Sequence, residues 1–160
     1  MIGLDTNVLA RYYVDDAGDA QAQRQRVAAR RLIESGQALM ISKTVVLELE
    51  WIMRGYYGFS QREVATVMRH LLGLHHVTVE DREVVEQALS NCDSDIDFAD
   101  ALHHASYKSC ASVATFDDRK FARRARKLGM TPAVKILSKL DEAILAVYEA
   151  KSKRTHSVSA

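Results

Sequence analysis

Four acidic residues lie where the sequence pattern predicts a strand to end or a helix to begin: Asp5, Glu48, Asp100 and Asp117. Asp5 ends a short apolar stretch, and Asp117 follows a run that finishes at Thr115. Glu48 falls in a helix expected after the second strand, and Asp100 falls in the first turn of another helix. Because the carboxyl ends of parallel strands face one side of a sheet, we expect these acids to converge in one cleft.

A cluster of carboxylates predicts a particular chemistry. Carboxylates in one cleft repel one another and stay ionised only if a cation neutralises them. Oxygen-only ligation suits Mg²⁺ or Mn²⁺. Such sites hydrolyse phosphodiesters, because the ion lowers the pKa of a water and stabilises the attacking and leaving oxygens.

Helix capping is the alternative explanation for two of the positions. Asp5, Thr6 and Asn7 can each accept a hydrogen bond from a free amide at a helix start. Asp97 fits the N-cap of the later helix, with Asp100 as its capping-box partner. These interpretations remain open at this stage.

Glu48 stands in an apolar helical segment, in the stretch VVLELEWIM. A buried charge requires a partner, so we interpret Glu48 as a member of the acidic cluster and not as surface decoration. Two alternatives stay open. Glu48 pairs with a basic residue, or it lies on an exposed stripe together with Glu50.

The elements that must position these acids alternate along the chain. Helical spacing of apolar residues dominates, and short apolar runs read as strands. The expected strands are 2–5, 38–41, 76–79, 111–115 and one within 131–137, and the expected helices are 6–13, 17–35, 44–55, 60–72, 80–91, 97–108, 118–128 and 138–150. Ser60 and Glu63 fit a capping box. The pattern predicts a helix-rich α/β fold, a three-layer α/β/α sandwich around a short, mainly parallel sheet.

Size and composition predict one soluble domain. The chain has 160 residues, 48% of them hydrophobic, and a formal net charge of +1, so no global field indicates nucleic acid. We expect a single domain over 1–150 and a disordered tail over 151–160. Cys92 and Cys110 lack metal-ligand spacing and are interpreted as inert core thiols. Neither a signal peptide nor a membrane span is expected, which makes the cytoplasm the default location.

Four stretches, in order, resemble the PIN-domain family and specifically its VapC-like toxins: IGLDTNVL, ISKTVVLELEWIMR, DFADALHHASYKSCASVATFD and KFARRARKLG. The resemblance covers roughly residues 1–140. It maps the family's acidic quartet onto Asp5, Glu48, Asp100 and Asp117, and a family hydroxyl residue onto Thr115. Asp117 is preferred to Asp118 because it lies two residues after Thr115, while Asp118 suits a helix N-cap.

The resemblance implies a Mg²⁺- or Mn²⁺-dependent ribonuclease, a homodimer, and a small antitoxin protein that blocks the cleft. Asp5 and Asp100 would be the principal metal ligands. Glu48 would ligate or orient the attacking water, and Asp117 would complete the site. Thr6, Asp97 and Thr115 are candidates for a supporting role. Two alternatives remain: an RNA-processing or structure-specific DNA nuclease without an antitoxin, and a non-catalytic α/β binding module.

A basic segment follows the last acid. Arg119, Lys120, Arg123 and Arg124 are candidates for binding the RNA substrate, because an acidic cleft alone would repel a polyanion. A solvated helix face is the alternative. Phe121, Ala125 and Leu128 are expected to dock this helix on the sheet. The aromatic residues Trp51, Tyr56, Tyr57 and Phe59 are interpreted as core or helix-turn packing, with an antitoxin groove or dimer surface as the alternative.

Overall fold

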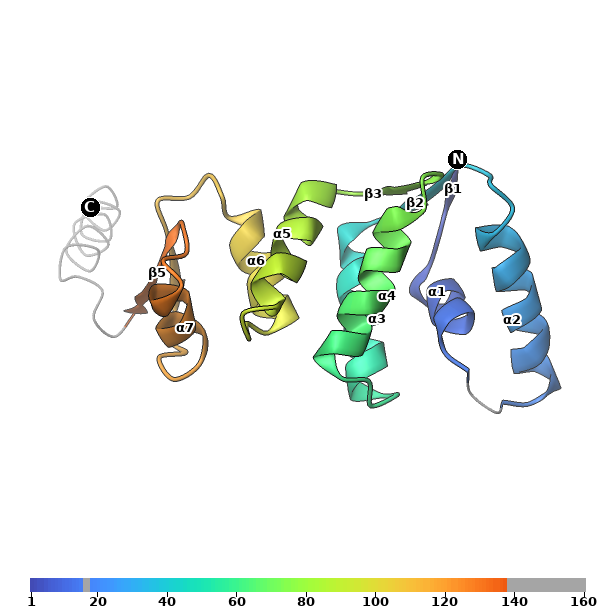
Figure 1. The fold of residues 1–160 in the computed structure, drawn as a ribbon, viewed down its shortest axis with the longest axis horizontal. Coiled ribbons are helices and arrows are strands. Elements are labelled where there is room, and N and C mark those ends of the chain that lie inside the picture. Colours follow the sequence, from blue (N-terminus) through green and yellow to red (C-terminus); the bar gives the residue numbers. More distant parts are fainter. Residues whose placement is uncertain (16–17, 138–160) are drawn as a thin grey trace, which may run out of the picture. The chain divides into compact units, whose positions relative to one another are not determined.

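The computed structural model describes residues 1–15 and 18–137. Strands and helices alternate along the chain (Figure 1), which confirms the helix-rich α/β prediction. Two compact units divide the chain, the first over Met1–Ser106 and the second beginning at Tyr107. The expected helix 138–150 and the expected tail 151–160 lie outside the described residues.

The first unit contains a three-stranded parallel sheet. Strands β1 (Ile2–Gly3), β2 (Leu39–Ile41) and β3 (Val77–Val79) lie in the order β1-β2-β3. Ile2 pairs with Leu39, and Leu39 pairs in turn with Val77. Because all three strands are parallel, their carboxyl ends share one edge of the sheet. Asp5, Ser42 and Glu80 follow these ends closely in the sequence.

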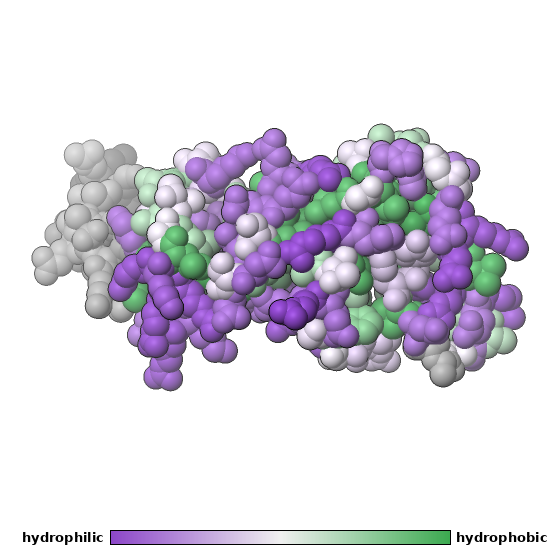
Figure 2. Space-filling view, viewed as in Figure 1, coloured by the Kyte–Doolittle hydropathy of each residue, from purple (hydrophilic) through white to green (hydrophobic). Residues whose placement is uncertain are grey.

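Six helices of the first unit are described: α1 (Thr6–Tyr13), α2 (Ala20–Ile33), α3 (Lys43–Gly55), α4 (Gln61–Gly73), α5 (Arg82–Cys92) and α6 (Phe98–Ser106). Helix α3 packs against α1, α4 and α6, and α5 packs against α6. The apolar faces meet in a core in which Leu9, Leu39, Leu49 and Met53 are completely buried. Hydrophilic side chains cover much of the face seen in Figure 2.

Side-chain caps decide where several helices begin. Ser60 and Glu63 form the predicted capping box at the start of α4. Asp19 accepts a hydrogen bond from the amide of Ala22, which places the start of α2 at Ala20 instead of residue 17. Ser42 caps α3 through the amide of Val45 at 3.3 Å. These caps satisfy amides that the first helical turn leaves without partners.

The second unit contains a two-stranded parallel sheet and one short helix in its described part. Strands β4 (Ser112–Thr115) and β5 (Ala133–Ile136) pair in register, with Val113 opposite Val134. Helix α7 (Phe121–Lys127) packs against β5. Phe121 and Ala125 are buried as predicted, but Leu128 is 44% exposed, so its expected place in the docking stripe was wrong.

The predictions for the two cysteines and for the aromatic residues were each wrong in part. Cys92 is buried as expected, whereas Cys110 is exposed. Trp51 and Tyr56 are 77% and 81% exposed, so these two aromatic side chains are not core residues. Tyr56 lies at the C-cap of α3, where its ring meets that of Tyr57 edge to face at 4.8 Å.

Candidate active site

Asp5 both ends the first strand and caps the first helix. Leu4 donates its amide to the carbonyl of Met40, which continues the β1–β2 ladder up to Asp5. The Asp5 backbone is extended, and one carboxylate oxygen accepts the amide of Thr6 at 2.8 Å. The other oxygen makes no hydrogen bond within the described part of the chain. Capping and presentation at the sheet edge are therefore compatible, because they use different oxygens of an exposed carboxylate.

Thr6 connects Asp5 to Glu48. The Thr6 side chain is buried, with 3% of the residue exposed, and its hydroxyl donates to Glu48 Oε2 at 2.5 Å. A hydroxyl held by the core and pointed at a carboxylate fixes the orientation of that carboxylate. The structure therefore brings together two acids that are 43 positions apart in the sequence.

The burial of the two glutamates on α3 differs from the prediction. Glu48 is exposed, although the sequence analysis interpreted it as a buried acid in an apolar segment. Glu50, which the alternative placed on an exposed stripe beside Glu48, is 2% exposed. The helix turns by about 100° per residue, so positions two apart point to different sides.

Glu50 has a cationic partner that the sequence analysis missed. Arg54 lies one turn further along α3 and donates to Glu50 Oε1 at 3.1 Å. Burial raises the pKa of Glu50, and the hydrogen bond and charge of Arg54 oppose that rise. The i, i+4 spacing of a glutamate and an arginine was the available signal for this pair.

Asp97 and Asp100 lie at the start of α6. Asp97 accepts the amide of Ala99 at 3.1 Å, and its carbonyl accepts the amide of Ala101, which supports the capping interpretation of this residue. Its second carboxylate oxygen receives Arg54 Nη1 at 2.9 Å. This hydrogen bond raises the pKa of Arg54 further above its ordinary value. Asp100 is half-buried in the first turn of α6, a helix that packs against α3.

Two further acids at the sheet edge were not predicted as functional, and their contacts explain them structurally. Glu80 follows β3 and accepts the backbone amide of Lys43 at 2.8 Å, at the start of α3. Asp81 pairs with the Lys43 ammonium at 2.6 Å. Asp81 has a φ of 48°, a left-handed conformation that aspartate tolerates better than most residues. Both acids hold the amino end of α3 at the edge of the sheet.

In the second unit, Asp117 accepts backbone amides of the turn that precedes α7, a helix whose N-cap is Lys120 and has no side-chain cap. Asp117 Oδ1 accepts the amides of Lys120 at 2.8 Å and Arg119 at 3.1 Å. These amides, first that of Lys120, hold the pKa of the Asp117 carboxyl below its usual range. The predicted N-cap at Asp118 was wrong: residues 118–120 form a turn, and α7 begins at Phe121. Thr115 Oγ1 accepts the amide of Asp117 at 3.0 Å, which orients the acid.

The expected basic residues follow this acid in the sequence. Arg119, Lys120, Arg123 and Arg124 are all exposed. Phe116, which stands between Thr115 and Asp117, is 76% exposed. The second unit therefore presents an aromatic ring, an acid and several cations in one short segment.

A family model for the PIN domain matches residues 2–127. The chain belongs to the PIN domain family. PIN domains are generally metal-dependent nucleases that bind nucleic acid and typically use Mg²⁺. No curated protein matches the chain. No helix among the described residues is long and apolar enough to cross a membrane.

The chemistry of the donors fits the divalent ion that PIN domains use. Asp5, Glu48 and Asp100 offer carboxylate oxygens, the ligands that hard cations prefer. Asp5 and Glu48 meet around Thr6, and Asp100 lies on a helix packed against the helix of Glu48. In residues 1–15 and 18–137, no three His, Cys, Asp or Glu side chains are grouped closely enough to hold a metal ion. Asp117 belongs to the second unit.

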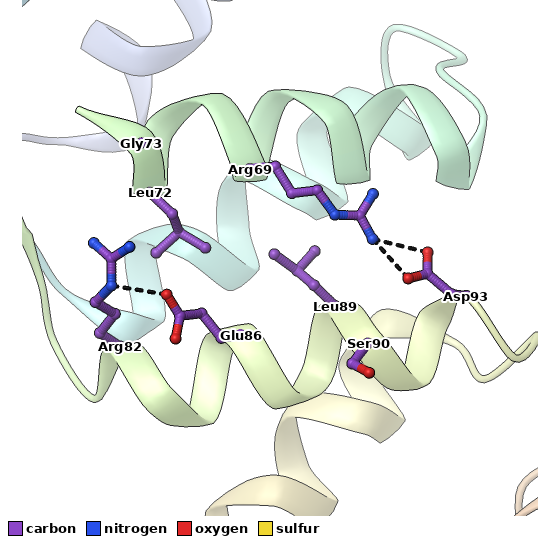
Figure 3. A pocket seen from close by; sticks show the side chains of 8 residues that line it. All are labelled: Arg69, Leu72, Gly73, Arg82, Glu86, Leu89, Ser90 and Asp93. Atoms are coloured by element: carbon purple, nitrogen blue, oxygen red, sulfur yellow. Dashed lines mark hydrogen bonds and ion pairs between the residues drawn. The ribbon is translucent and has the colours of Figure 1, made fainter.

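A cavity of about 390 Å³ lies elsewhere in the first unit of this PIN domain, between α4 and α5 (Figure 3). Arg69 and Asp93 pair on one side of it, and Arg82 and Glu86 pair on the other. None of the predicted site residues lines it.

Proposed function

We propose that this PIN domain is a Mg²⁺- or Mn²⁺-dependent endoribonuclease and the toxin of a toxin–antitoxin pair. One observation carries the nuclease proposal. Asp5, at the edge of a parallel sheet, and Glu48, on α3, meet around the buried Thr6 in a chain that belongs to a nuclease family.

Each acid has a proposed role. Asp5 and Asp100 are the principal ligands, Glu48 ligates the ion or orients the attacking water, and Asp117 completes the site. When bound, the ion supplies an activated water and neutralises charge on the scissile phosphodiester. Thr6 holds Glu48 in orientation through its hydroxyl, and Thr115 holds Asp117 through the amide of that acid.

The segment around Asp117 supports a single-stranded RNA substrate. An exposed aromatic ring such as Phe116 can stack on an unpaired base, because every base has a π-face. Arg119, Lys120, Arg123 and Arg124 are exposed and can bind the phosphates of the same strand. The antitoxin partner and the homodimer rest on the resemblance of the four sequence stretches to VapC-like toxins.

Digestion of a mixed RNA pool with and without Mg²⁺ tests the proposal, with Asp5→Asn and Asp100→Asn as the key variants. We expect cleavage by the wild type only with the ion, and loss of cleavage in both variants. Asn keeps an oxygen that can accept the amide of Thr6, so Asp5→Asn should retain the helix cap. Removing a carboxylate also relieves repulsion, so the melting temperature without metal should hold or rise.

Three outcomes would contradict parts of the proposal. Full activity in either variant at matched metal concentration would reject the assigned site. Cleavage of structured DNA with RNA left intact would favour the DNA nuclease alternative. If co-expression of a small protein encoded beside this gene does not inhibit RNA cleavage, the antitoxin part of the proposal is rejected.

A further inference from the structure

One arginine joins the two helices that carry Glu48 and Asp100. Arg54 Nη1 donates to Glu50 Oε1 at 3.1 Å within α3, and to Asp97 Oδ2 at 2.9 Å at the start of α6. Arg54 and Asp97 are 43 positions apart in the sequence. The contact therefore fixes one helix against another and goes beyond local helix stabilisation.

Glu50 holds Arg54 in this place. The Glu50 side chain is only 3% exposed, and a buried carboxylate without a cation is strongly unfavourable. Arg54 itself is 36% exposed, so its guanidinium lies at the boundary between the core and the surface. Because the same nitrogen, Nη1, donates to both carboxylates, the anchoring of Arg54 by Glu50 also holds its hydrogen bond to Asp97 in place.

We propose that Arg54 is a positioning residue of the metal site. Through Asp97 it fixes the first turn of α6, and with it Asp100, relative to Glu48 on α3. Asp97 and Asp100 are three residues apart, a spacing that places their side chains close to each other along one helix face. This inference rests on the proposed function, in which Glu48 and Asp100 serve the same ion.

The first unit offers a matched control in a second arginine that joins two helices. Arg69 on α4 donates to both oxygens of Asp93, the C-cap of α5, at 2.8 Å (Figure 3). Its exposure and that of Asp93 are 48% and 62%, comparable to 36% and 47% for Arg54 and Asp97. Neither α4 nor α5 carries a predicted ligand, so the loss of this pair should affect packing without reaching the metal site.

The experiment measures Mn²⁺ affinity by the electron paramagnetic resonance signal of the free ion. The variants are Asp97→Asn, Arg54→Lys and Arg54→Met, with Arg69→Met and Asp93→Asn as controls, each with its melting temperature. Quenching of Trp51, the single tryptophan, by paramagnetic Mn²⁺ is a second readout, because Trp51 lies one turn from Glu48 on α3.

Asp97→Asn is expected to weaken Mn²⁺ binding by roughly tenfold, the low end for groups that orient metal ligands. Asn still offers an oxygen to the amide of Ala99, so this variant should keep the helix cap. Arg54→Lys should restore part of the affinity, because lysine keeps the charge but not the planar fork. The two control variants should bind Mn²⁺ as the wild type does.

Wild-type affinity in Asp97→Asn would overturn the inference, and so would equal losses in Arg69→Met. If Arg54→Met does not fold, Asp97→Asn and Arg54→Lys decide the question. If the wild type does not bind Mn²⁺, or binds it equally well after Asp5 and Asp100 are replaced by Asn, the proposed function and this inference both fail. A wild type that binds, beside an Asp97→Asn variant that binds equally well, overturns the inference alone.

Discussion

Glu48 and Glu50 are the same residue type on the same helix, two positions apart, and their environments are opposite. Glu48 is exposed and receives the hydroxyl of Thr6, whereas Glu50 is 2% exposed and receives the guanidinium of Arg54. The helical period separates their directions by about 200°. One face of α3 therefore presents an acid to the sheet edge, and the other uses an acid to anchor the helix.

This difference means that burial in an apolar segment does not by itself support the proposed role of Glu48. A metal ligand must be accessible to the ion and the substrate, and Glu48 is exposed. A buried acid must be neutralised by its own protein, and Arg54 does this for Glu50. Because Arg54 also holds Asp97, the buried face connects to the helix that carries Asp100. The buried face of α3 is thus linked by Arg54 to the helix that carries Asp100, while the exposed face carries Glu48.

The largest expected effect separates the two glutamates by activity. Glu48→Gln should lower kcat by about 100-fold or more, as expected when a group that orients the attacking water loses its charge. Glu50→Gln should lose less than about tenfold, because Gln still accepts the hydrogen bond of Arg54 and acts only through position. Steady-state cleavage of one RNA at saturating Mg²⁺ measures both. A greater loss in Glu50→Gln than in Glu48→Gln would reverse the roles of the two faces.

The second prediction concerns stability and tests the buried face. Arg54→Met leaves the Glu50 carboxylate without its cation and should lower the free energy of unfolding by about 3 kcal/mol, the low end of the range because Arg54 is partly exposed. The double variant Glu50→Gln/Arg54→Met should recover at least half of this loss, since the buried charge is gone. Urea denaturation at constant m value measures both. Equal stability of the single and double variants would show that Glu50 is not neutralised by Arg54.

A smaller effect is expected at the hydroxyl that orients the exposed glutamate. Thr6→Val keeps the shape of a residue that is 3% exposed and removes its hydrogen bond to Glu48. Because Glu48 can be solvated instead, the cost should be about 1 kcal/mol of unfolding free energy. The rate of RNA cleavage should fall by more than the roughly fivefold that 1 kcal/mol represents, because Glu48 loses its fixed orientation. A Thr6→Ser variant keeps the hydroxyl and is the matched control. A Thr6→Val enzyme as active as Thr6→Ser would remove Thr6 from the site.

The sequence predicted the elements better than it predicted the faces of the helices. Local signals predicted the capping box at Ser60 and offered the cap at Asp97 as one interpretation, because both features depend on neighbouring residues only. Which side of α3 is buried depends on packing against α1, α4 and α6, which local patterns do not contain. Apolar residues surround both glutamates in VVLELEWIM, so periodicity could not separate Glu48 from Glu50. The same limit led to the wrong burial of Trp51.

Site prediction had a similar boundary. Four acids were predicted to converge in one cleft, and the described contacts link two of them, Asp5 and Glu48, through Thr6. The choice of Asp117 over Asp118 as the site acid stays a prediction, whereas the helix cap expected at Asp118 was wrong, because the turn over 118–120 delays the start of α7 to Phe121. The positioning role of Arg54 was missed because it depends on a hydrogen bond to Asp97, which lies far from Arg54 in the sequence.

Cys92 is a chemical probe of the buried face of α3 that carries Glu50. Cys92 is 7% exposed, and burial, assisted by the charges of Asp97 and Glu50, raises the pKa of its thiol to about 12. A raised thiol pKa means that at pH 8 only about one Cys92 in 10,000 is a reactive thiolate. Cys110 is exposed. Iodoacetamide at pH 8 should therefore label one thiol per folded chain, at Cys110, and both thiols in urea, as counted by mass spectrometry.

Glu48→Gln should leave this labelling pattern unchanged. Arg54→Met should speed the labelling of Cys92, because it loosens the contact at Asp97 and Glu50. Fast labelling of Cys92 in the folded wild type would show that the face carrying Glu50 is open to solvent, and the contrast between the two glutamates would fail.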